Sequence, residues 1–304
     1  MPQGPAVATE QQSLEVNGTP RLFLLTTPAP SPAVTPRPLV LDFHGLAEGA
    51  QLQATTSQFG VLGQKDGFIV AFPQGTGNPS QWDTSATSHP NADLTYVTDM
   101  LNSIESRLCV DTSRVYADGF SDGAFMVSLL ACTMASRFAA IAAVSGLLMP
   151  KPCLAARPVP ILAFHGTADP ILYFNGGIGT AVLNHALNGG PTPPTTTTVP
   201  ANLNGSGYPA NVRAWANRDG CNPHSTETMR APHIIERTYR CPPGVGVVFY
   251  IVLDGGHAWP GSKFTQSIAN ITGFTTFEIN ATDTIWKFFG DFQLPRAMAK
   301  SARH

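Results

Sequence analysis

Runs of mainly apolar residues recur along the chain and end at Gly, Pro, His or Asp. Short continuous runs of this kind are typical of strands that are buried on both faces of a sheet. The predicted strands cover residues 39–43, 68–72, 114–118, 138–144, 159–164 and 247–253. Two further strands are predicted at 13–16 and 21–26, on either side of the turn Asn17-Gly18.

Segments suited to helices separate these runs. They cover residues 53–66, 93–108, 124–132, 208–218 and 282–292. Apolar strands that alternate with helices predict an α/β fold with a mostly parallel sheet and helices on both faces. In such sheets, functional side chains gather at the carboxyl ends of the strands. Here those ends carry His44, Ser121, Asp169 and His257.

The chain shows no internal repeat and no sign of a second core, so we predict one domain over residues 13–294. Residues 1–12 are expected to be disordered, and 295–304 are expected to form a flexible tail. A Pro-rich connector covers 28–38. The insertion 178–210 contains the low-complexity stretch 191–200, which is expected to be an extended loop. The insertion could cover a site as a lid, or it could be a passive surface loop.

The clearest motif is Gly119-Phe120-Ser121-Asp122-Gly123, which fits Gly-x-Ser-x-Gly. A predicted strand precedes it and a predicted helix follows it, which is the context of a nucleophile elbow. The two glycines allow a tight turn in which strand and helix approach closely. We therefore predict that Ser121 is a nucleophile, exposed above the sheet.

A serine hydroxyl needs a base, and the base needs a third group that orients it. In this context the order along the chain is serine, acid, histidine. Ser121, Asp169 and His257 meet that order at three strand ends. Asp254 is an alternative acid that breaks the order, and His165 is a weaker alternative base, expected to support the loop instead.

The tetrahedral intermediate also needs donors for its oxyanion. The backbone N–H of Asp122, at the start of a helix, is one candidate. The other is expected in the loop after an early strand, where the Leu46 N–H is preferred to that of Ala47. The His44 side chain is expected to be structural.

Aromatic residues near the predicted strand ends are candidates for the wall of an acyl or aryl pocket. Ordinary core packing is the competing interpretation for each, most of all for Phe120. Trp259 is the preferred candidate because it follows His257 by two residues. The candidate pocket residues are Trp82, Phe120, Tyr173, Phe174 and Trp259.

Charged residues make up 12% of the 304 residues, and the formal net charge is −2. No basic cluster with interleaved aromatics is present, so we expect no nucleic-acid partner. No apolar run is long enough to cross a membrane.

A serine mechanism needs no cofactor and no metal, although the sequence does not exclude a calcium site on the loops. Residues 1–10 lack a basic start and an apolar stretch, so either the protein is not exported or its signal peptide is missing from this sequence.

The chain has five cysteines, and its sparse charge suits an oxidising, extracellular setting. A bridge between Cys221 and Cys241 would restrain the turn-rich polar segment between them. Cys132 with Cys153 is the preferred second pair, but Cys109 with either of them is also possible.

Several motifs taken together resemble the polyhydroxybutyrate depolymerase and feruloyl esterase group of the α/β-hydrolases, close to carbohydrate esterase family one. The resemblance covers most of the chain, from about residue 39 to about residue 292. The motifs are His44-Gly45, residues 119–123, residues 165–169 with Gly176-Gly177, residues 215–221 and residues 256–261.

The resemblance implies an α/β-hydrolase fold and a secreted bacterial serine esterase, with the triad on Ser121, Asp169 and His257. It also implies the Cys221–Cys241 bridge. The expected substrates are short-chain hydroxyalkanoate esters or feruloyl and other aryl esters, in polymers or oligomers, cleaved by a monomer. An acetylxylan-type or general carboxylesterase is the alternative, and an amidase or a non-catalytic binding protein is a more distant one.

Overall fold

The structure is a computed structural model, and it describes residues 9–29, 35–189 and 200–295. Its centre is a ten-stranded sheet in the order β1-β2-β4-β3-β5-β6-β7-β10-β9-β8. The six strands from β4 to β10 in this order run parallel, and antiparallel pairs extend the sheet at both edges. The strands are β1 (Thr9–Val16), β2 (Thr19–Thr26), β3 (Arg37–Phe43), β4 (Ile69–Pro73), β5 (Val110–Phe120), β6 (Ala140–Val144), β7 (Ile161–Gly166), β8 (Ser225–Ala231), β9 (Ile234–Tyr239) and β10 (Val247–Val252).

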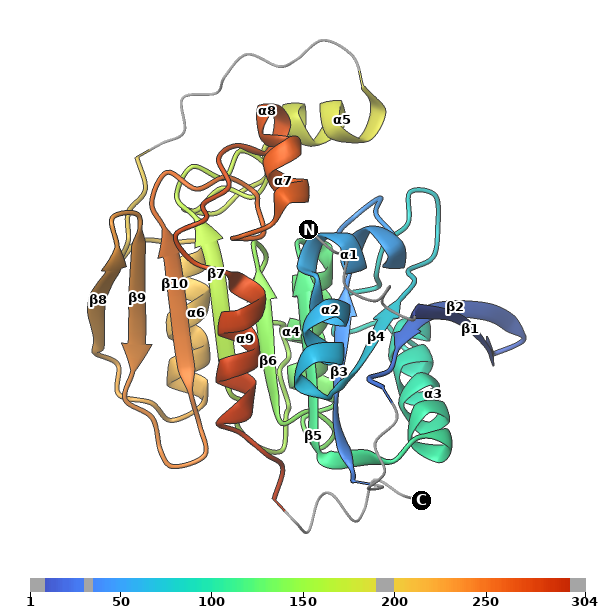
Figure 1. The fold of residues 1–304 in the computed structure, drawn as a ribbon. Coiled ribbons are helices and arrows are strands. Elements are labelled where there is room, and N and C mark those ends of the chain that lie inside the picture. The colour runs from blue at the N-terminus through green and yellow to red at the C-terminus, as the bar shows by residue number, and fades with distance from the viewer. Residues whose placement is uncertain (1–8, 30–34, 190–199, 296–304) are drawn as a thin grey trace.

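Helices cover both faces of this sheet, as Figure 1 shows. One face packs against α1 (Ala50–Ser57), α2 (Phe59–Asp66) and α9 (Ala281–Gly290). The other face packs against α3 (Ala92–Arg107), α4 (Asp122–Thr133) and α6 (Tyr208–Arg218). The helices α5 (Thr180–Asn188), α7 (Lys263–Ser267) and α8 (Ala269–Thr272) lie beyond the carboxyl ends of the parallel strands. The apolar strands are buried because both faces are covered, as the sequence predicts.

Four local expectations are wrong. The predicted helix 53–66 is two helices, because Gln58 takes a left-handed conformation with φ of 59°. The segment between Cys221 and Cys241 is the strand pair β8–β9 rather than a turn-rich loop. Residues 9–12, which were expected to be disordered, lie in β1. The insertion 178–210, which was expected to be a loop, contains the helix α5. The predictions for 1–8, 191–199 and 296–304 fall outside the described residues.

Two disulfides join Cys132 to Cys153 and Cys221 to Cys241, as predicted, and Cys109 is an exposed free thiol. The first bridge ties the end of α4 to the segment after β6. The second ties the end of α6 to the segment after β9. No described helix is long and apolar enough to cross a membrane, and the described residues contain no cluster of His, Cys, Asp and Glu suited to a metal ion.

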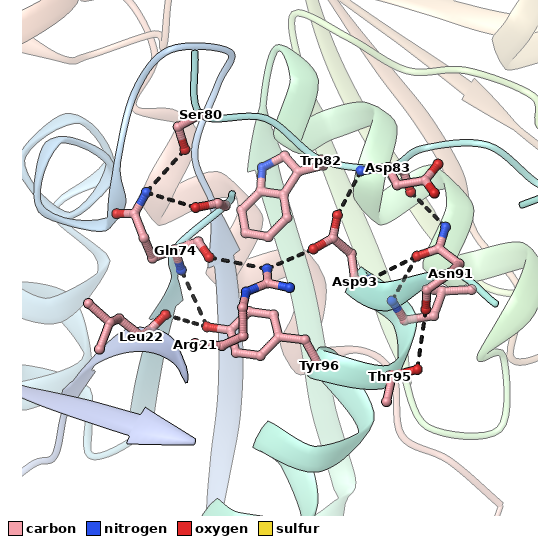
Figure 2. Close-up of polar contacts among 12 residues, drawn as sticks. Arg21, Leu22, Gln74, Ser80, Trp82, Asp83, Asn91, Asp93, Thr95 and Tyr96 are labelled. Atoms are coloured by element: carbon pink, nitrogen blue, oxygen red, sulfur yellow. Dashed lines mark hydrogen bonds and ion pairs between the residues drawn. The ribbon is translucent and has the colours of Figure 1, made fainter. Parts of the chain in front are cut away.

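A buried ion pair fixes the loop between β4 and α3. Arg21 Nη2 lies 2.7 Å from Asp93 Oδ1, with its guanidinium stacked over the Tyr96 ring, as Figure 2 shows. The other Asp93 oxygen accepts the Asp83 N–H, and the Arg21 guanidinium also donates to the Gln74 carbonyl. Charged groups that are buried need partners of this kind. The loop is therefore held at both ends.

Candidate active site

Ser121 lies in the turn between β5 and α4. Its backbone has φ of 56° and ψ of −115°, a conformation that L-residues rarely adopt outside strained turns. A Cβ on Gly119 would stand 2.4 Å from the Gly123 carbonyl, and a Cβ on Gly123 would stand 2.2 Å from the Phe43 carbonyl oxygen. The glycines are needed because the strand, the turn and the neighbouring strand end touch there. This geometry is that of the predicted elbow.

His257 and Asp169 lie in direct contact. The His257 Nδ1 is 2.8 Å from Asp169 Oδ2, and both side chains are buried. The other Asp169 oxygen accepts the N–H groups of Ile171 and Leu172, each at 2.8 Å. The His257 N–H donates to the Thr272 carbonyl at 2.6 Å. The acid is thus held by its own turn, and it fixes the ring of His257 with Nδ1 protonated.

Ser121 and His257 line the same pocket above the strand ends. The Phe120 ring lies 4.9 Å from the His257 ring and lines this pocket too. The structure therefore gathers the three predicted residues at one place, with Asp169 behind His257. A serine hydroxyl that shares a pocket with an imidazole oriented by a carboxylate is suited to nucleophilic attack on an acyl group.

Neither competitor takes the predicted role, although His165 Nε2 lies 3.3 Å from Asp169 Oδ2. His165 Nε2 donates to the Leu172 carbonyl at 2.8 Å, and the ring stacks on Tyr208 with centroids 3.4 Å apart. Burial lowers the pKa of His165 to about 4, so this side chain stays neutral and supports the Asp169 turn. Asp254 is exposed, and its backbone N–H donates to the Thr167 hydroxyl.

The loop after β3 is fixed by His44. The His44 Nδ1–H donates to the Gly45 carbonyl at 2.7 Å, and Nε2 accepts the Gly75 N–H at 2.9 Å. Burial lowers the pKa of His44 to about 4, which agrees with a neutral structural histidine. Both ring nitrogens are occupied, so this side chain has no free group for catalysis.

The backbone of this loop leaves one candidate donor available. The Ala47 N–H donates to the Ser80 carbonyl at 2.7 Å. Within the described part of the chain, the N–H groups of Leu46 and Asp122 have no acceptor. Leu46 lines the pocket beside Ser121, and Asp122 follows Ser121 directly. These two N–H groups are thus available to an oxyanion.

The predicted aromatic wall is largely wrong. The structure buries Trp82 against Phe43 and His44, where its indole N–H donates to the His44 carbonyl at 2.9 Å. Its backbone N–H donates to Asp122, whose carboxyl pKa is raised to about 6 by burial. Trp82 therefore braces the loop behind the pocket instead of lining it.

Trp259 and Tyr173 also lie outside this pocket. The Trp259 indole donates to the Thr282 hydroxyl, and its ring lines a separate pocket beside α2. Trp82, Phe174 and Trp259 are buried, whereas Tyr173 is half-buried. Of the predicted aromatics, Phe120 alone is among the described residues that line the pocket of Ser121. The wall is instead aliphatic and comes from the loop after β3, from the turn after β7, from α5 and from the segment of α7 and α8. Its members are Leu46, Ile171, Leu183, Ala186, Leu187, Ile268 and Ile271.

Glu48 is a pocket residue that the sequence does not reveal. It lies on the loop after β3, lines the pocket and accepts the Gly45 N–H at 2.9 Å. Burial raises the pKa of its carboxyl, while the nearby His257 acts in the opposite direction. The sequence gives one indication of this role, which is that Glu48 follows Gly45 by three residues. This indication can be recognised only when the geometry of the loop is known.

Comparisons with known proteins agree on one group. The model of the family described as Esterase PHB depolymerase matches residues 23–185. The "Putative esterase NocK" of Nocardia uniformis subsp. tsuyamanensis is 30% identical over 291 residues, 92% of this chain and 82% of that protein. Feruloyl esterase B of Piromyces equi is 30% identical over 229 residues, 73% of this chain but 39% of that protein.

A solved structure shares the fold. Acetyl xylan esterase from Aspergillus awamori aligns with a TM-score of 0.59 and 16% sequence identity, covering 92% of this chain and 99% of that one. At this identity the likeness concerns the fold, which is that of the α/β-hydrolases. The predicted fold class is confirmed.

Proposed function

This chain belongs to the Esterase PHB depolymerase family and is a carboxylic ester hydrolase, and we propose that it works through an acyl-enzyme formed on Ser121. The observation that carries the proposal is the shared pocket of Ser121 and His257, with Asp169 2.8 Å behind the imidazole. The strained elbow and the two free N–H groups support it. A cofactor has no role in the proposal.

The reaction begins when Ser121 Oγ attacks the ester carbonyl while His257 Nε2 takes the hydroxyl proton. The negative charge on the carbonyl oxygen is stabilised by the N–H groups of Leu46 and Asp122. His257 then gives its proton to the leaving alcohol, and Asp169 stabilises the imidazolium meanwhile. Water repeats the path on the acyl-enzyme, which releases the acid and restores Ser121.

The pocket wall favours an aliphatic acyl group. Most of its members are Leu, Ile and Ala side chains, which suit an alkyl chain, and Phe120 supplies the one aromatic ring among the described lining residues for stacking on a feruloyl group. We therefore infer that short aliphatic acyl esters, including hydroxyalkanoate esters, are better substrates than feruloyl esters. An acetylxylan-type activity is the second candidate, because small acyl groups also fit an aliphatic wall.

We further propose that the protein is extracellular and monomeric. The two disulfides support the extracellular location.

The test compares initial rates on p-nitrophenyl butyrate and methyl ferulate for the wild type and Ser121→Ala. We expect the wild type to cleave the butyrate faster and Ser121→Ala to cleave neither, with an unchanged melting temperature. Ser128→Ala is the matched control within α4, because its hydroxyl donates to the Ala124 carbonyl and accepts the Leu148 N–H, away from the pocket. Turnover retained by Ser121→Ala would refute the acyl-enzyme.

A further inference from the structure

The pocket has few polar groups besides Ser121 and His257. The other polar side chains that line it, among the residues described, are Glu48, Thr265 and Thr272. Both threonine hydroxyls already donate to backbone carbonyls, at 3.3 and 3.2 Å. Glu48 is therefore the side chain that could offer a polar atom to a substrate without taking part in the bond-making steps.

The Glu48 carboxyl is fixed beside the nucleophile. Its Oε2 accepts the Gly45 N–H at 2.9 Å. A Cβ built on Gly45 would stand 3.0 Å from that oxygen and 3.2 Å from the Ser121 Cβ, so carboxyl and nucleophile flank one glycine. Within the described residues Oε1 accepts no hydrogen bond, and it is not one of the fully buried polar atoms that lack a partner. Because Glu48 lines the pocket, Oε1 is the carboxyl oxygen that is available to a substrate there.

We propose that Glu48 is a specificity-determining residue, whose free oxygen accepts a hydrogen bond from a hydroxyl group of the ester substrate. The inference rests on the proposed function and names what its pocket recognises. A carboxyl among aliphatic side chains has lost most of its water, so a donor on the substrate restores a bond that an apolar substituent cannot make. A hydroxyl near the ester bond, on either the acyl or the alcohol half, has the required reach.

The test uses pairs of esters in which a hydroxyl replaces a methyl group. In the acyl arm these are p-nitrophenyl 3-hydroxybutyrate and p-nitrophenyl 3-methylbutyrate. In the alcohol arm they are 2-hydroxyethyl butyrate and propyl butyrate. The ratio of kcat/KM within each pair is measured for the wild type, Glu48→Gln and Glu48→Leu. We expect the ratio to favour the hydroxyl in one arm and to fall roughly ten- to hundred-fold in the variants, most in Glu48→Leu.

The ratio separates recognition from structural damage, because a disturbed Gly45 turn lowers both members of a pair equally. Glu15→Gln, on an exposed position of β1, removes the same charge and should leave both ratios unchanged. Ratios that are equal in the wild type and both Glu48 variants, in both arms, overturn the inference alone. A wild type that cleaves none of the four esters, or a Ser121→Ala variant that still cleaves them, overturns the proposed function and this inference with it.

Discussion

Every oxygen of Asp169 has a defined partner, which makes this residue sensitive to a change of one atom. Its Oδ1 accepts two backbone N–H groups and its Oδ2 accepts His257 Nδ1–H. In Asp169→Asn, the amide oxygen can satisfy the backbone, but the NH₂ group then meets another donor on His257. The ring is expected to adopt the other tautomer, with Nε2 protonated and unable to act as a base. We predict a fall in kcat of roughly a thousand-fold or more on p-nitrophenyl butyrate.

The control is Asp254→Asn, the acid that sequence order disfavours. Asp254 is exposed and contacts the Thr167 hydroxyl through its backbone N–H. Its variant should keep kcat within about two-fold of the wild type. If the two substitutions lowered kcat equally, the assignment of Asp169 as the orienting acid would be wrong.

The residues of the proposed triad can be predicted from the sequence because each lies on the loop that follows an apolar strand, and because chain order restricts the choice. The pocket aromatics could not be predicted in this way. Proximity to a strand end does not tell whether Trp82 or Trp259 turns toward the pocket or into the core, and both turn into the core. Glu48 could not be predicted either, but for a different reason. Its role depends on a turn that brings its carboxyl back to the Gly45 N–H.

At the scale of elements, α5 supplies much of the pocket wall through Leu183, Ala186 and Leu187. Truncation of Leu183 to Ala removes apolar contact from the far part of an acyl chain, and a two-carbon chain is too short to use that contact. A loss of about 1–2 kcal/mol corresponds to a five- to thirty-fold change. We predict that Leu183→Ala lowers kcat/KM for p-nitrophenyl hexanoate by that factor relative to p-nitrophenyl acetate.

Asn184→Ala is the matched control, because Asn184 is its exposed neighbour on the same helix. It should leave the hexanoate-to-acetate ratio unchanged. An equal loss on both esters in Leu183→Ala would mean that α5 supports the fold rather than the acyl chain. Whether the whole insertion moves as a lid stays a prediction.

The strand pair β8–β9, at one edge of the sheet, was the hardest part of the fold to predict. Five of the seven residues of β8 are exposed, so this strand has no alternation of apolar and polar residues from which it could be predicted. Pairing with β9 forms this strand, through backbone hydrogen bonds and cross-strand contacts such as Arg237 with Glu227. The break at Gln58 was not predicted either, because the residue that takes the left-handed conformation is not a glycine. Central strands were predicted well because burial on both faces dictates their composition.

At the scale of the whole molecule, the centre of the sheet contains a pair of buried carboxyls. Asp42 on β3 lies opposite Asp118 on β5, and both are fully buried. Asp42 accepts hydrogen bonds from Gln53 and Ser57, each at 2.5 Å, whereas Asp118 has no donor among the described residues. The pair is satisfied when Asp118 keeps its proton and donates to Asp42. Burial raises the pKa of Asp42 to about 7 and that of Asp118 well above its ordinary value.

The raised pKa values fix the sign of a pH effect on stability. Between the unfolded pKa of about 4 and the raised folded values, the folded state binds more protons than the unfolded state. The contribution of this pair to the free energy of unfolding therefore falls as pH rises from about 4 through 7, by up to about 1.4 kcal/mol per pH unit for each proton retained. Asp118→Asn replaces the proton by an amide N–H that can donate to Asp42 at any pH.

We predict that Asp118→Asn unfolds with a free energy that depends less on pH, and that its stability relative to the wild type grows between pH 5 and pH 8. Urea unfolding at pH 5, 6, 7 and 8 measures this difference. Asp66→Asn, at an exposed position, should give a curve parallel to the wild type. Parallel curves for Asp118→Asn would show that Asp118 is ionised in the folded protein. The strands that hold the Ser121 turn and the Gly45 loop would then carry an uncompensated charge, which their complete burial argues against.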